Sequence, residues 1–288
     1  MMTREQWNRA VDGYIETQTA LVGKPVILDP KAPSSFPQAH SMITEDVIKE
    51  FAINIGDHNP LFVDPRYAEQ TRWGSIIAPP GRFINYIAET GSFPRGAAVP
   101  GSNFLYGGTT YEMYDVIRPG DSFTIQDMRI DFQEKALSPE KAERYRLLSM
   151  VSRRDYLNQH GKIVLSATGN VMITCVYPGS PGAETAQGVY AAPLSKPSYT
   201  DQELDALYRY YEDYYSGKYT RGKETRFWED VSVGDEVTAL VKGPHDVTDM
   251  AAFLCAIGGT LGNSATKWES LRVLHTDRDP DTRAWLSR

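Results

Sequence analysis

The stretch that decides the fold is SFTIQDMRIDFQ (Ser122–Gln133), a strand-like run rich in β-branched and aromatic residues. Three further runs of this kind are GTTYEMYDVI (Gly108–Ile117), RYRLLSMVSRRDYL (Arg144–Leu157) and KIVLSATGNVMITCVY (Lys162–Tyr177). The breaks between the four runs, RPGD, ALSPEKAE and NQHG, are short and contain turn residues. Such runs joined by short turns are typical of antiparallel strands. The sequence therefore predicts four long antiparallel strands.

A helix is predicted upstream of these strands, in HSMITEDVIKEFAINIG. A short strand comes first, and Thr44 then stands at the N-cap position of the helix. Val47, Phe51 and Ile55 recur at helical spacing, and Gly56 ends the helix. The polar loop GDHNPL follows directly, at a place where side chains are free to face a ligand.

A second helix is predicted in GSIIAPPGRFINYIAETG, after the entry prolines Pro79 and Pro80. Its apolar stripe consists of Phe83, Ile84, Ile87 and Ala88. One helix together with a short strand and four long antiparallel strands predicts an α+β fold, in which the sheet wraps round a central helix.

Composition restricts the class of protein. The chain has 288 residues, of which 41% are hydrophobic, enough for one large core or two ordinary ones. Its net charge of -7 argues against nucleic-acid binding, which depends on clustered Lys and Arg. No window is apolar enough to span a bilayer, and the amino terminus resembles a helix, Arg4 to Gly23, rather than a signal peptide. Cys175 and Cys255 lie in apolar runs, which favours a reducing, cytoplasmic location.

The rest of the chain is predicted to contain a linker with a tyrosine-rich helix (179–223), followed by a partial repeat (224–288) of the first domain (1–178). Thr200 and Glu203 form a predicted capping box for the tyrosine-rich helix. In the repeat, a strand and a helix match HSMITEDVIKEFAINIGD, with Thr248 and Phe253 in the places of Thr44 and Phe51. The repeat is incomplete, because the four-strand series is not seen after Gly259.

The order of motifs resembles the MaoC-like (R)-specific enoyl-CoA hydratase/dehydratase family, which has the hotdog fold. The motifs are T-E-D-x-I, G-D-x-N-P-L, D-P-x-Y-A, W-G-x-I-I-A-P-P and R-P-G-D. The best match is the branch with a fatty-acid-synthase-type N-terminal dehydratase domain. The resemblance covers roughly Val22 to Val176 well and Glu224 to Gly259 weakly.

The resemblance implies an active site. Hydration of an enoyl thioester needs a base that activates water, a proton donor at Cα, and a donor to the thioester oxygen. Asp57 and Asn59 match the family's D-x-N-P-x-H motif, and the Gly81 amide matches the donor to the carbonyl. Phe62 stands where the family has histidine, so the catalytic pair is incomplete, and His58 is the alternative base. Asp57 and Asn59 are also typical turn residues, which is the structural alternative.

The resemblance further implies an acyl pocket along the central helix. Its expected lining residues are His58, Phe62, Pro80, Phe83, Ile84, Tyr86 and Ile87. No metal ligand spacing is found among the five histidines and two cysteines, and no cofactor is expected besides the coenzyme A thioester itself.

Three hypotheses about function follow. The first is an acyl-CoA hydratase or dehydratase, a lyase that is active alone or in a complex. The second is a non-catalytic acyl-CoA-binding subunit whose partner supplies the Asp/His pair, and the third is a hotdog thioesterase. We expect a hetero-oligomer with a small hotdog subunit, or a homodimer, because Met250, Phe253, Leu254 and Ile257 need a cover. We expect these side chains to pack against the first domain, a second copy of this chain or a separate subunit.

Overall fold

The structure is a computed structural model that describes residues 2–26, 42–81, 83, 99, 102–180, 198–219, 227–236 and 239–256. The chain divides by its contacts into two units. The first unit combines Met1–Gly188 with Asp249–Arg288, and the second is Val189–Thr248. The domain boundaries that the sequence suggests, after residues 178 and 223, stay predictions.

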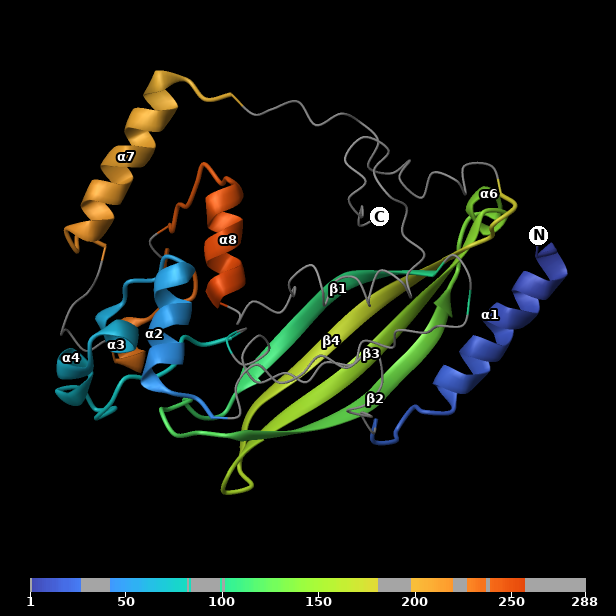
Figure 1. Cartoon of the computed structure of the whole chain (residues 1–288), viewed down its shortest axis with the longest axis horizontal. Helices are drawn as coiled ribbons and strands as arrows, with labels where there is room; N and C mark the ends of the chain where they lie inside the picture. Colours follow the sequence, from blue (N-terminus) through green and yellow to red (C-terminus); the bar gives the residue numbers. More distant parts are fainter. Residues whose placement is uncertain are drawn as a thin grey trace, which may run out of the picture. The chain divides into compact units, whose positions relative to one another are not determined.

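The first unit is built on a four-stranded antiparallel sheet (Figure 1). Its strands are β1 (Ser102–Met113), β2 (Phe123–Lys135), β3 (Tyr145–Asn158) and β4 (Ile163–Val176), in the order β1-β4-β3-β2. These are the four predicted strands, and the α+β prediction is confirmed. The turns that join β2 to β3 and β3 to β4 are short enough to keep each strand beside the next, which is why the local turn signals predicted the pairing.

Four described helices of the first unit lie before the sheet in sequence. They are α1 (Arg4–Thr19), α2 (Glu45–Asn54), α3 (Pro60–Val63) and α4 (Pro65–Glu69); α6 (Pro139–Ala142) joins β2 to β3. Thr44 caps α2 as predicted, because its side chain accepts the Val47 N–H. The short strand expected before α2 is not formed at Met42 and Ile43. Ile43 instead exchanges two backbone hydrogen bonds with the turn before β2.

Two hydrophobic clusters cover the sheet at opposite ends. At one end, α2 packs on the end of β3 and the start of β4, through Phe51, Tyr156 and Leu165. At the other end, Trp7 and Val11 of α1 pack on the strands. The strand residues of this second cluster are Phe132, Leu148, Met150, Ile173 and Cys175. The central helix predicted from Phe83 onward lies outside the described residues, apart from Phe83 itself.

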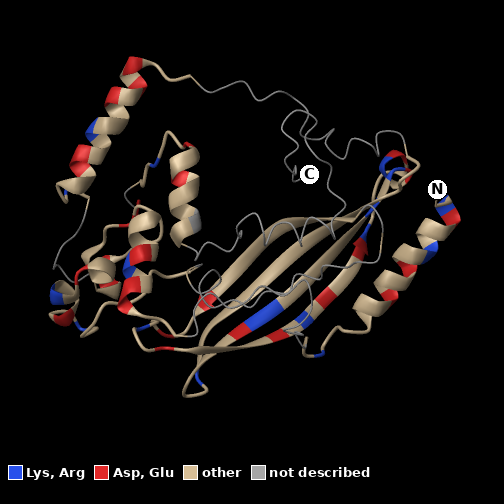
Figure 2. Cartoon of the chain, in the orientation of Figure 1, with Lys and Arg blue, Asp and Glu red and all other residues tan. Residues whose placement is uncertain are grey.

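A polar belt lies between the two clusters, on β2 and β3, where Figure 2 shows acidic and basic positions. Asp127 and Arg129 are buried in it. Arg154 Nε donates to Asp127 Oδ2 at 2.9 Å, and Arg129 Nη1 donates to Gln18 Oε1 of α1 at 2.9 Å. Burial raises the pKa of Asp127 from 3.8 to about 6, while the charge of Arg129 opposes the rise.

This shift predicts a pH dependence of stability. Because the folded chain holds the Asp127 proton more tightly than the unfolded chain, the free energy of unfolding should fall as the pH rises from about 4 to about 6. The fall is at most about 3 kcal/mol, at about 1.4 kcal/mol per pKa unit, and the ion pair with Arg154 reduces it. Urea unfolding across this pH range, in wild type and D127N, measures it. Equal pH slopes in the two proteins would contradict the assignment to Asp127.

The second unit contains α7 (Asp201–Tyr215) and the 3-10 turn η2 (Trp228–Asp230). The predicted capping box of α7, between Thr200 and Glu203, is confirmed. Tyr210 Oη donates to Ala239 O at 3.1 Å, and Tyr211 Oη exchanges hydrogen bonds with the Gly243 backbone at 2.8 and 2.9 Å. These hydrogen bonds therefore connect the segment 239–243 to α7.

The predicted repeat forms its helix but not its strand. The helix is α8 (Val247–Ala256), and the described residues from 227 to 246 contain η2 and no strand. In the first unit, Ala256 is buried in the cluster around α2 and Phe253 packs against it. Part of the α8 apolar face is therefore covered by the first unit of the same chain, while Met250 stays 59% exposed. The Leu254 side chain and Ile257 lie outside the described residues.

Candidate active site

The loop that carries Asp57 begins with a helix C-cap. Gly56 has φ of 69°, its N–H donates to Ile53 O, and the Asp57 N–H donates to Ala52 O at 2.8 Å. This pair of hydrogen bonds is the Schellman motif, which requires the left-handed conformation that glycine adopts without strain. The backbone of Asp57 is thereby anchored to the last turn of α2.

Two polar side chains of the loop also form its turns. Asp57 Oδ1 accepts the Asn59 N–H at 3.1 Å, and Asn59 Oδ1 accepts the Leu61 N–H at 3.0 Å as the N-cap of α3. Both residues therefore have the structural role that the sequence offered as the alternative. A carboxylate has about four acceptor positions, so one turn bond leaves Asp57 able to accept a proton from water. Asp57 is half-buried, while His58 and Asn59 are exposed.

Phe62 is a core residue. It is 7% exposed and forms a small cluster with Ala52 of α2 and Ile77. Leu61, Val63, Trp73 and Val116 pack against this cluster. The position where the family has histidine is therefore filled by a ring that joins α3 to α2 and to the loop before Gly81.

Gly81 has φ of 85°, in the region that favours glycine. Its N–H points to the Met113 sulfur, with a nitrogen-to-sulfur distance of 3.2 Å. A thioether is a weak acceptor, so a thioester oxygen can replace it at little cost. Pro80 is exposed, and Phe83 is 1% exposed.

The structure brings two of the predicted segments together through an aromatic contact. Phe51 of α2 meets Phe83 edge to face, with ring centroids 5.1 Å apart. Asp57 follows α2 and Gly81 precedes Phe83, so each lies on a segment that enters this contact. The predicted pocket residues Ile84, Tyr86 and Ile87 lie outside the described residues. The roles predicted for Asp57, Asn59, Gly81, His58, Phe62 and Pro80 stay predictions.

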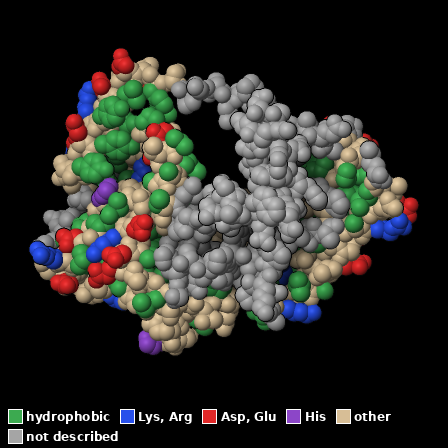
Figure 3. All heavy atoms as spheres, in the orientation of Figure 1, with side chains coloured by type: hydrophobic (Ala, Val, Ile, Leu, Met, Phe, Trp, Pro, Cys, Tyr) green, Lys and Arg blue, Asp and Glu red, His purple; other side chains and the backbone are tan. Residues whose placement is uncertain are grey.

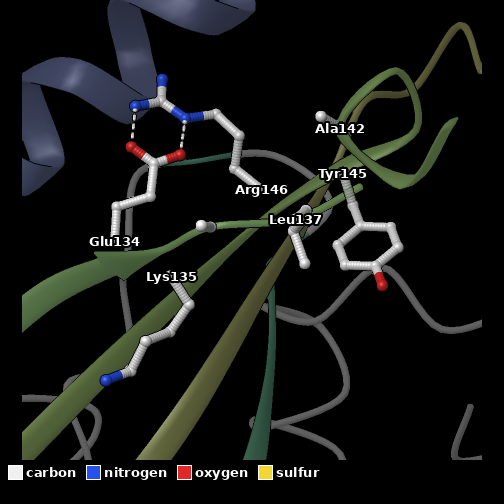
Figure 4. A pocket seen from close by; sticks show the side chains of 7 residues that line it. Glu134, Lys135, Leu137, Ala142, Tyr145 and Arg146 are labelled. Atoms are coloured by element: carbon white, nitrogen blue, oxygen red, sulfur yellow. Dashed lines mark hydrogen bonds and ion pairs between the residues drawn. The ribbon is translucent and has the colours of Figure 1, made fainter. Parts of the chain in front are cut away.

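An open hollow lies at the other end of the sheet, where β2 and β3 join through α6 (Figure 4). Its lining includes Leu137, Tyr145 and Glu134, which pairs with Arg146 at 2.7 Å. Arg146 also binds Asp12 of α1 at 2.6 Å. None of the predicted site residues lines this hollow. The ion pairs of Arg146 with Glu134 and Asp12 connect α1 to the sheet there.

Two features are absent from the described ranges. No group of three or more His, Cys, Asp or Glu side chains there could hold a metal ion. Nor does any helix in those ranges combine the length and the apolar character of a membrane span.

The sequence reading missed two residues near the site. Met113 is the acceptor of the Gly81 N–H. Arg118 Nη1 donates to Trp73 O at 2.7 Å and to Ser75 Oγ at 3.1 Å. The only sequence signal for Arg118 is its place in R-P-G-D, which predicts a turn between strands.

Residues 34–167 match the family model described as "FAS1-like, dehydratase domain region". No curated protein matches the chain in sequence. A MaoC-like dehydratase from Rhodospirillum rubrum is similar in structure, with 20% identity, TM-score 0.38, and coverage of 48% of this chain and 89% of that chain.

Two further solved structures are similar to this chain. The ChsH1-ChsH2 complex from Mycobacterium tuberculosis has 14% identity, TM-score 0.43, and coverage of 60% of this chain and 96% of that chain. The (R)-hydratase from A. caviae involved in PHA biosynthesis has 18% identity, TM-score 0.31, and coverage of 45% and 87%.

The matched segment includes β1, β2 and β3, the loop of Asp57 and Asn59, and Gly81. The α+β fold with its four-stranded antiparallel sheet agrees with the sequence prediction, and the central helix of the predicted hotdog lies outside the described residues apart from Phe83. The comparisons therefore identify residues 34–167 of this chain as similar to a FAS1-like dehydratase domain region.

Proposed function

We propose that the chain is a hydratase or dehydratase subunit that acts on an α,β-unsaturated or 3-hydroxyacyl thioester of coenzyme A. In hydration, Asp57 takes a proton from water as the water oxygen adds to Cβ, and the Gly81 N–H binds the thioester oxygen of the enolate that forms. Cα then takes a proton from the Asp57 carboxyl or from the histidine of the partner, and dehydration reverses these steps. Asn59 holds the turn in which Asp57 lies. The reaction uses acid–base chemistry without a cofactor, in the cytoplasm.

One observation carries the proposal. The matched residues 34–167 contain both Asp57 and Gly81, and the local geometry of each supports the role proposed for it. Asp57 has a half-buried carboxylate whose backbone is anchored by the C-cap of α2. Gly81 has an N–H whose acceptor is only a thioether.

A second candidate is favoured by the burial of Phe62. With an aromatic ring packed on Ala52 and Ile77, this chain does not place an imidazole beside Asp57 from the family's histidine position. An acyl-thioester-binding subunit whose partner supplies an intact Asp/His pair would then carry out no chemistry itself. In both cases we propose a small hotdog protein as the partner.

Exposed apolar side chains support the need for a partner. In the second unit, Trp228 is 89% exposed and Leu240 is 63% exposed. Figure 3 shows further hydrophobic side chains on the surface of α7, where Tyr208 and Tyr215 are exposed. Large exposed apolar areas are uncommon in monomers and often mark interfaces.

We therefore expect the purified chain to associate in solution, and its activity to depend on a hotdog partner with an intact D-x-N-P-x-H motif. Light scattering on the chain alone and with the partner tests association. Loss of the enoyl absorbance of crotonyl-CoA and of bulkier enoyl-CoAs tests activity in the same samples, and the partner alone is the control.

The outcomes separate the candidates. Hydration that needs both chains and is lost in D57N supports a catalytic subunit. Hydration that needs both chains but survives D57N supports the binding subunit, and release of free coenzyme A would indicate a thioesterase. A stable monomer that hydrates enoyl-CoA without a partner would disprove the need for one.

A further inference from the structure

The turn Ile117–Asp121, which contains the R-P-G-D motif, is bonded to two distant segments. Ile117 O accepts the Ala78 N–H at 2.9 Å. Gly120 N donates to Ile43 O at 2.7 Å, and Ile43 N donates to Asp121 O at 2.7 Å. The turn therefore holds the residue before the cap of α2 and the segment that leads to Gly81.

Arg118 adds a side-chain connection to the second of these segments. Its Nη1 donates to Trp73 O at 2.7 Å and to Ser75 Oγ at 3.1 Å. Its own backbone N–H donates to Asp121 Oδ2 at 2.8 Å, which fixes the start of the side chain. A guanidinium is rigid and planar, so it holds two acceptors in a defined geometry, which an ammonium on a flexible chain does not do.

The packing around the turn agrees with these hydrogen bonds. Ile43, Ile76, Ala78 and Ile117 are all buried in the cluster that also contains Phe51 and Phe83. A displacement of the loop 73–78 would therefore move the backbone that leads to Gly81 relative to α2. Asp57 is bonded to the end of α2, so the relative position of Asp57 and the Gly81 N–H depends on this turn.

We propose that Arg118 is a positioning residue for the active site: it holds the loop 73–78 so that the Gly81 N–H and Asp57 face the same substrate. This inference rests on the proposed function for its effect on turnover, but not for its effect on the loop. Arg118 does not touch the substrate in this proposal. It acts through Trp73 and Ser75.

The first test is kinetic and uses the complete active assembly. We expect R118Q to lower kcat by about 10²-fold, because a misplacement of about 1 Å between reacting groups costs about that much. KM should change much less, since none of the residues predicted to line the acyl pocket lies on this turn. R118K should fall between R118Q and wild type. R66Q, which changes an exposed arginine of α4, is the matched control and should keep wild-type kinetics.

A purely structural role gives a different result. In that case R118Q would lower the free energy of unfolding and the yield of folded protein, but the folded enzyme would keep its kcat. Urea unfolding and active-site concentration are therefore measured for each variant. A wild-type kcat per folded R118Q enzyme would overturn the proposal.

The second test does not need activity. Hydrogen exchange followed by mass spectrometry reports the Ala78 amide, which is bonded to Ile117 O. R118Q should speed exchange in the peptide around residues 74–81 about tenfold, while peptides of β3 and β4 stay unchanged. S75A should have a smaller effect, and adding it to R118Q should change little more, because the two side chains act as one contact.

The two tests distinguish the two proposals. If wild type shows no turnover with any partner, the proposed function fails, and exchange alone decides the role of Arg118. Unchanged exchange around residues 74–81 in R118Q would overturn the positioning role, whatever the activity of wild type.

Discussion

D57N should lower the turnover of the active assembly by about 10²–10⁴-fold, the usual contribution of a general base. Asparagine keeps a side-chain oxygen that can accept the Asn59 N–H, so the turn after α2 should stay intact. Only the negative charge and the proton-accepting capacity are lost. Single-turnover hydration of crotonyl-CoA by the complex of the chain and its partner measures the change.

D64N is the matched control for this substitution. Asp64 caps α4 through the Arg66 and Tyr67 N–H groups, and asparagine caps helices equally well. It should therefore leave turnover and stability close to wild type. Activity of D57N within a few-fold of wild type would assign Asp57 to the turn alone and leave the chemistry to the partner.

F62A should lower the free energy of unfolding by about 3–5 kcal/mol, the usual cost of removing a buried phenylalanine. The ring is 7% exposed and lies between Ala52 and Ile77, so the loss would loosen α3, α2 and the loop before Gly81 together. Urea unfolding at fixed pH measures it. F62L, which keeps an apolar side chain, should cost clearly less.

F62H tests the family's histidine position directly. We expect it to destabilise the chain as well, because an imidazole buried in this apolar cluster lacks a hydrogen-bond partner for at least one ring nitrogen. It should not restore an Asp/His pair. A stable F62H variant with higher activity than wild type would show that the ring merely fills the histidine's place and that the site tolerates the exchange.

Local signals explain the parts of the fold that could be predicted. The four strands follow from runs rich in β-branched and aromatic residues and from the turn residues between them, and the starts of α2 and α7 follow from Thr44 and Thr200, which cap them. Each of these depends on residues within a few positions of one another. The order of motifs also located the dehydratase region before any contact was known, and residues 34–167 match it.

The strand predicted between Phe227 and α8 shows where local signals stop. A strand forms only if another backbone pairs with it. In the second unit the backbone groups of Ala239 and Gly243 instead form hydrogen bonds with the side-chain hydroxyls of Tyr210 and Tyr211. The residues have the composition of a strand, but their hydrogen-bond partners lie about thirty positions away on a helix. No periodicity in the segment itself contains that information.

The sequence by itself determined the four strands, the helix caps and the position of the dehydratase-like region, because these depend on short-range chemistry and on motif order. Only the tertiary structure decided that Phe62 is a core residue, since its neighbours Ala52 and Ile77 come from other segments. It also revealed the hydrogen bonds of Arg118, whose acceptors lie 45 and 43 positions away. Side chains take such roles from long-range packing, which places groups together that no local pattern in the chain connects.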